Sequence, residues 1–95
     1  MVFTLKEGAV DHRTAVREFL QRLLEQKGDH HPFSDSDSLV FSGRLQSVDV
    51  VDVVMFLEEK WSIDFARIGF DASQVDSVDA IDTLINHAEI SHPRL

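Results

Sequence analysis

The chain has 95 residues, a length that suits a single domain, and 43% of them are hydrophobic, which is enough for one small core. It contains no cysteine, which excludes disulfides, thiolate zinc sites and cysteine nucleophiles. The formal net charge is -8, and residues 29–95 hold thirteen Asp/Glu against four Lys/Arg, so the surface should repel nucleic acid and anionic membranes and attract basic proteins.

The N-terminal segment, MVFTLKEGAV, lacks the basic start and long apolar run of a signal peptide. No stretch of the sequence approaches a membrane-spanning length. We therefore expect a cytoplasmic monomer made of a single domain over residues 1–95, with an ordered core at about 10–90.

Residues 10–27 have the pattern of an amphipathic helix. Apolar side chains recur at the three-and-four spacing that makes one stripe along a helix: Val16, Phe19, Leu20, Leu23 and Leu24. Gly28 is expected to end this helix, and Pro32 follows shortly after, as is common beyond helix ends.

Residues 29–46 form a long segment rich in His, Ser, Asp and Gly, which predicts a loop. Its scattered apolar residues, Leu39, Phe41 and Leu45, are expected to pack across the helices. The pair His30-His31 beside Asp29 is more typical of a solvated surface than of a metal site. The segment DSDS at 35–38 begins like a calcium loop but lacks the turn glycine and the closing glutamate.

Residues 47–61 predict a second helix, although the valines in this segment would also suit a strand. The segment is too long for a typical strand, and its charges fall on one arc of a helical projection. The expected core arc holds Val50, Val53, Val54, Leu57 and Trp61. The opposite arc holds Asp49, Asp52, Glu59 and Lys60, with Phe56 among them.

A third strip of this helix, Val48, Val51 and Met55, lies between the two arcs and is edged by acidic residues. Two interpretations stay open. The strip could be additional core, covered by the first and last helices. It could also be a partner-binding patch, in which the apolar centre supplies affinity and the acidic rim steers basic partners.

The remaining segments complete an all-α fold. Residues 62–70 are expected to be irregular, a short helix is expected at 71–75 with Asp71 as its cap, and the last helix at 78–90 with Ser77 or Asp76 as its cap. Asp76, Asp79 and Asp82 are expected on the solvated side of that helix. The predicted fold is a small four-helix bundle with three longer helices, a short third helix and a long loop between helices one and two.

Ser47 lies where the long loop meets the second helix, and its position allows two roles. A serine there can cap the helix by accepting a bond from an orphan amide. A helix start also stabilises a phosphate through its free amides and its dipole. Position alone does not choose between these roles.

Similarity to a known family centres on the run from Gly43 to Phe65, GRLQSVDVVDVVMFLEEKWSIDF. This run resembles the acyl carrier and peptidyl carrier proteins, in which a serine before a small apolar residue opens the second helix and a glycine lies four residues earlier. The family's helix-ending aromatic falls on Trp61 and its following apolar position on Phe65. The later run VDSVDAIDTLI at 75–85 is similar to the family's course into its last helix.

The resemblance implies a four-helix carrier with no catalytic activity of its own. A phosphopantetheinyl transferase would move phosphopantetheine from coenzyme A onto Ser47 in a magnesium-dependent step. Acyl or aminoacyl thioesters would then be carried on the arm in fatty acid or secondary metabolite biosynthesis, and the arm would supply the chemistry. The first methionine favours a stand-alone protein, although a domain cut from a larger synthase would look the same.

The resemblance also implies contacts with loading ligases or synthases that have basic docking surfaces. The expected contact residues are Val48, Asp49, Val51, Asp52, Met55, Glu58 and Glu59. Any pocket between the second helix and its neighbours is expected to be lined by Val51, Val54, Met55 and Phe65. One departure is Gln46, where the family usually has an aspartate that helps to present the serine and the metal ion to the transferase.

Two other functions are alternatives for this sequence. The first is an unmodified helical adaptor of the same fold, which would bind a protein partner through Val48, Val51 and Met55. The second, a serine hydrolase using Ser47, is disfavoured because no G-x-S-x-G elbow surrounds the serine and none of the five histidines lies in a motif that would make it a base.

Overall fold

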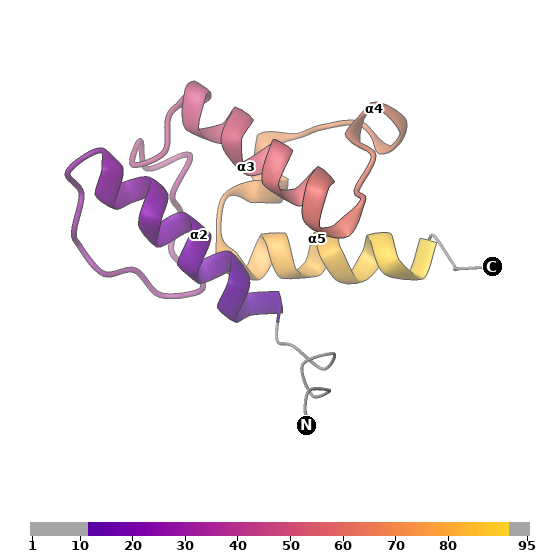
Figure 1. Ribbon diagram of the computed structural model, residues 1–95, viewed down its shortest axis with the longest axis horizontal. Helices are drawn as coiled ribbons and strands as arrows, with labels where there is room; N and C mark the ends of the chain where they lie inside the picture. Colours follow the sequence, from indigo (N-terminus) through magenta and orange to yellow (C-terminus); the bar gives the residue numbers. More distant parts are fainter. Residues whose placement is uncertain (1–11, 92–95) are drawn as a thin grey trace.

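The computed structural model describes residues 12–91 of the chain and the side chains of residues 12–88. Within this part the elements are α2 (His12–Gln26), α3 (Ser47–Trp61), α4 (Phe65–Ile68), the 3-10 turn η1 (Ala72–Val75) and α5 (Val78–Ser91), and no strand is present. The long loop between α2 and α3 and the short elements after α3 connect three longer helices (Figure 1). The prediction of a small all-α bundle is confirmed.

The core forms where the apolar faces of α2, α3 and α5 meet. The predicted stripe of α2 is buried except for Phe19, which is only partly buried at the edge of the core. One face of α5 is also buried, through Val78, Ile81, Ile85 and Ala88. The buried apolar residues are Val16, Leu20, Leu23, Leu24, Leu39, Leu45, Val53, Leu57, Ile63, Phe65, Val75, Val78, Ile81, Leu84, Ile85 and Ala88.

The loop between α2 and α3 is attached to the core by two of its three predicted apolar residues. Leu39 and Leu45 are fully buried, and the Leu45 amide donates to the Leu39 carbonyl at 2.7 Å. The prediction that Phe41 packs inward is wrong, because its side chain is 66% exposed. A turn closed by the Gly43 amide and the Val40 carbonyl (3.0 Å) places Phe41 at its outer corner.

The acidic residues around the start of α5 hold the loop and α2 instead of facing only solvent, so the prediction of a solvated side is wrong for them. The Asp76 carboxylate accepts hydrogen bonds from the Ser38 hydroxyl (3.0 Å) and from the backbone of residues 40 and 41 (2.8 and 3.0 Å). Arg13 of α2 pairs with Asp79 at 2.5 Å and with Asp82 at 3.4 Å. These contacts fix the loop across the bundle.

The connection from α3 to α5 contains one more helix than expected. Residues 62–70 were predicted to be irregular, but α4 forms there because Asp64 caps it by accepting from the Arg67 amide at 3.3 Å and because Phe65 is buried. The short turn η1 and its cap Asp71 are confirmed, as is Ser77, whose hydroxyl oxygen accepts from the Ala80 amide at 3.0 Å. None of the described helices is long and apolar enough to cross a membrane.

Candidate functional site

Ser47 is the first residue of α3, and it is exposed to solvent. Gln46, with an extended backbone, occupies the cap position, so the interpretation of Ser47 as the helix cap is wrong. Within residues 12–88 the Ser47 hydroxyl makes no hydrogen bond. The first turn of α3 is therefore completed without this hydroxyl, which stays available to react.

The start of α3 is capped by Gln46 and Asp49 together, in a capping box, although the helical projection places Asp49 on the solvent-facing arc. Asp49 is only 7% exposed, and its Oδ2 accepts from the Gln46 amide (2.9 Å) and from Lys27 Nζ (2.6 Å). Burial raises the pKa of this carboxyl, but the Gln46 amide and the Lys27 ammonium together outweigh burial and leave the pKa below its usual value. The prediction of Asp49 as a surface contact is therefore wrong, since its carboxylate is held inside the fold.

The apolar strip of α3 is exposed to solvent, so the interpretation of this strip as core is wrong. Val48, Val51 and Met55 are 68%, 54% and 52% exposed, respectively. Three further predicted contact residues, Asp52, Glu58 and Glu59, are also exposed on α3. We name this surface, Val48, Val51, Asp52, Met55, Glu58 and Glu59, the α3 patch.

A groove runs beside Ser47 and has a volume of about 590 Å³. It lies where the loop, the first turns of α3 and the segment around η1 meet, and it is lined by Val40, Gly43, Leu45, Gln46, Ser47, Val50, Val51, Phe70 and Ala72. Gly43 has a φ of +90°, a conformation that glycine adopts without steric cost. An apolar groove thus opens next to the exposed hydroxyl.

The predicted pocket lining is correct for two of its four residues. Val51 lines this groove and Met55 lines a hollow between α2 and α3, whereas Val54 lines neither and Phe65 is buried in the core. Phe70 lines the groove instead, and an edge-to-face contact with Phe65 (5.6 Å between ring centroids) supports it. The signal that could have found Phe70 is its place directly before the cap Asp71, where an apolar residue often packs against its own helix.

A second hollow, of about 290 Å³, lies between α2 and α3 on another side of the α3 patch. Phe19 and Phe56 form part of it and stack with ring centroids 4.0 Å apart. Phe56 is therefore packed against α2, whereas the helical projection places it on the polar arc of the helix. Met55, Asp52 and Glu59 of the patch line the same hollow.

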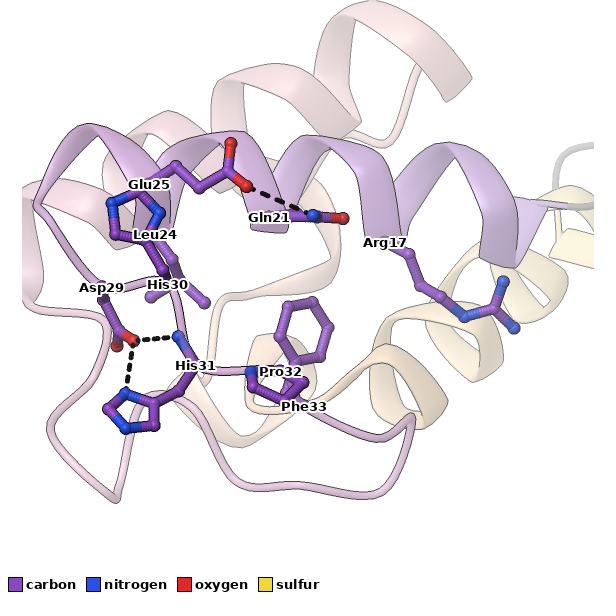
Figure 2. A pocket seen from close by; sticks show the side chains of 9 residues that line it. All are labelled: Arg17, Gln21, Leu24, Glu25, Asp29, His30, His31, Pro32 and Phe33. Carbon is purple, nitrogen blue, oxygen red and sulfur yellow. Dashed lines mark hydrogen bonds and ion pairs between the residues drawn. The ribbon is translucent and has the colours of Figure 1, made fainter.

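Figure 2 shows a third hollow, between α2 and residues 29–33 of the loop, where Asp29 contacts the backbone and ring of His31 and Gln21 bonds to Glu25. The Arg44 guanidinium is the main cause that lowers the pKa of Asp29 to about 2.

Across the described side chains, no three His, Cys, Asp or Glu residues gather as a metal site. The DSDS segment is engaged otherwise: Asp35 binds Arg13 and Arg17, and Asp37 accepts from the Ser34 amide.

Comparison with known proteins found no matching family model, and no curated protein or solved structure with significant similarity to this chain.

Proposed function

We propose that this chain is an acyl or aminoacyl carrier protein that bears phosphopantetheine on Ser47. The observation that carries the proposal is the Ser47 hydroxyl, which is exposed and unbonded among the described residues at the first residue of α3. It stands in a sequence run that resembles carrier proteins. A serine used only for structure would be expected to cap the helix, and here that task belongs to Gln46 and Asp49.

The surroundings of Ser47 fit the attached group. The amides of residues 47 and 48 precede the first intrahelical bond of α3, from the Val50 amide to the Gln46 carbonyl (2.9 Å), so they and the helix dipole favour a phosphodiester. The apolar groove beside Ser47 offers a surface for the arm. When attached, the arm supplies a terminal thiol that carries thioesters.

The modification step uses one atom of this chain. The Ser47 oxygen attacks the β-phosphorus of coenzyme A, an O–P bond forms, and the pyrophosphate bond to the α-phosphate breaks. Adenosine 3′,5′-bisphosphate leaves, and the hydroxyl proton passes to a base on the transferase. The transferase and its Mg²⁺ provide the catalysis, and the carrier provides a correctly placed nucleophile.

Gln46 bears on how efficiently the transferase acts. Its backbone amide is bound to Asp49, while the residue is exposed beside Ser47. A glutamine keeps hydrogen-bonding capacity but lacks the charge that the usual aspartate would offer to a metal ion. Gln46→Asp should therefore raise the rate of modification, measured as kcat/KM for the chain.

The α3 patch is the proposed docking surface for the transferase and for loading enzymes. Its apolar centre is exposed and its rim is acidic, which complements enzymes with basic docking surfaces. Asp49 is not part of this surface, because its carboxylate already binds Lys27. The chain is thus proposed to act through recognition and presentation.

The test is the intact mass of the chain after incubation with coenzyme A, Mg²⁺ and a broad-specificity phosphopantetheinyl transferase. We expect the wild type to gain one phosphopantetheine group and Ser47→Ala to gain none. Ser36→Ala is the matched control, since Ser36 is also exposed and lies in the loop before α3, and it should be modified like the wild type. Absence of modification with several transferases would contradict the proposal.

An unmodified helical adaptor is the second candidate function. The exposure of Val48, Val51 and Met55 supports it, because a contiguous apolar strip on a helix is typical of protein–protein contact. The same experiment separates the two functions. A chain that stays unmodified would leave the α3 patch as its main functional surface.

A further inference from the structure

Lys27 lies one residue beyond the end of α2 and connects the two sides of the segment that holds Ser47. Its Nζ donates to the Arg44 carbonyl and to Asp49 Oδ2, both at 2.6 Å. The same Asp49 oxygen accepts from the Gln46 amide at 2.9 Å. One ammonium group therefore links Arg44, which precedes Ser47, to Asp49, which follows Ser47 in the first turn of α3.

Burial makes this contact costly to lose. Among the described side chains Asp49 is the one charged residue that is buried, and the Lys27 side chain is only 28% exposed. A buried carboxylate without its cation would be left uncompensated. The pair should therefore hold its geometry more firmly than a surface ion pair would.

The segment before Ser47 is held from other directions as well. The Arg44 guanidinium binds Asp29 through two hydrogen bonds of 2.9 and 3.0 Å and the His31 carbonyl at 2.8 Å. Leu45 is buried in the core. The backbone on each side of Ser47 is thus fixed, while the Ser47 side chain itself stays unbonded among the described residues.

We infer that Lys27 is a positioning residue for phosphopantetheine transfer, which holds the loop and the first turn of α3 so that the Ser47 hydroxyl is presented in one place. This inference rests on the proposed function. Lys27 does not touch the reacting atoms and acts through Asp49 and Arg44. A nucleophile that moves relative to its docking surface spends less time in line with the phosphorus, which lowers the rate of transfer.

Lys27→Met tests the inference, with Arg17→Met as the matched control. Both changes remove a cation that joins the α2 region to an aspartate, but Arg17 pairs with Asp35, well before Ser47 in the chain. We expect Lys27→Met to lower kcat/KM for modification about tenfold, mainly through kcat, and to speed hydrogen exchange at the Gln46 amide. Arg17→Met should leave both quantities near the wild type, and Lys27→Arg should restore most of the rate.

Asp49→Asn is the second variant if Lys27→Met does not fold. It removes the charge that Lys27 binds but keeps an amide oxygen that can accept from the Gln46 amide, and it should give a similar loss of rate. Modification of Lys27→Met at the wild-type rate, or an equal loss of rate in Arg17→Met, would overturn the positioning role of Lys27 and leave the proposed function standing. A wild-type chain that is not modified would overturn the proposed function, and this role with it.

Discussion

At the scale of single residues, the Ser47 hydroxyl is exposed and unbonded among the described residues because its neighbours satisfy the helix end. Asp49 takes the capping bond from Gln46, and Lys27 neutralises Asp49. The Ser47 hydroxyl is therefore left exposed at a helix start, where the free amides and the helix dipole favour a phosphate. The same residue type at a cap position, as at Ser77 before α5, is instead bound to the backbone.

Acid should destabilise the fold through its buried and bonded carboxylates. Burial raises the pKa of Asp76, but hydrogen bonds from the Phe41 backbone, the Ser38 hydroxyl and the Val40 backbone outweigh burial and leave the pKa below its usual value. The pKa of Asp49 is also lowered, and the pKa of Asp29 is lowered to about 2. Aspartates in the unfolded state have a pKa of about 3.9. Between about pH 4 and pH 2 the unfolded state therefore binds more protons than the folded state, and stability is lost as the pH falls.

The measurement is the urea midpoint of unfolding as a function of pH. We expect the midpoint to fall below about pH 4 in the wild type. Asp76→Asn should be less stable than the wild type at pH 7. Its urea midpoint should fall less on acidification, because the variant lacks one carboxyl group with a lowered pKa. A wild-type midpoint that is unchanged from pH 5 to pH 2 would contradict this account of the carboxylates.

Leu39 and Phe41 offer a direct comparison of a buried and an exposed apolar residue in one loop. Leu39→Ala removes a fully buried side chain and should lower the free energy of unfolding by about 3 kcal/mol. Phe41→Ala removes a larger side chain that is 66% exposed and should change it by less than about 1 kcal/mol. Chemical denaturation of both variants checks this, and equal losses would show that the loop is packed differently.

At the scale of elements, α3 is a helix with more apolar surface than its packing uses. Val53 and Leu57 are buried in the core, and Phe56 stacks on Phe19 of α2. Val48, Val51 and Met55 remain exposed beside Asp52 and Glu59. Such a strip next to an exposed serine is the docking surface that the carrier proposal requires.

Reversal of charge on α3 tests the docking role of its acidic rim. Asp52→Lys with Glu59→Lys should lower kcat/KM for modification by about tenfold or more, because attraction to a basic enzyme surface becomes repulsion. The effect should appear mainly in KM and shrink as salt is raised. Glu18→Lys, which alters an exposed acid on α2, should have little effect. Equal effects of both changes would contradict a docking surface on α3.

The sequence predicted α3 well because its charges and apolar residues keep helical spacing over fifteen residues. It could not predict the burial of Asp49, because a helical projection contains no information on Lys27, which lies far from Asp49 in the chain. Phe56 was misplaced for the same reason, since its stacking partner belongs to α2. The four-residue helix α4 depends on the Asp64 cap and on burial of Phe65, and so short an element leaves no periodicity to detect.

At the scale of the whole molecule, the fold uses its acidic residues for two purposes. Asp29, Asp35, Asp76 and Asp79 tie the long loop and α2 to the rest of the bundle. Other acids, on α3, stay exposed, and the carrier proposal assigns them to the encounter with basic partners. The part of the long loop next to α3 is held by the Asp29–Arg44 pair, and this part sets the start of α3, where the proposed attachment site lies.

The most direct test of the carrier proposal is the location of the added group. After reaction with coenzyme A and a phosphopantetheinyl transferase, the chain is digested and its peptides are fragmented in a mass spectrometer. The account predicts one phosphopantetheine group per chain, assigned to Ser47, with other serines unmodified. A group found on another residue, or no group after reaction with several transferases, would contradict it.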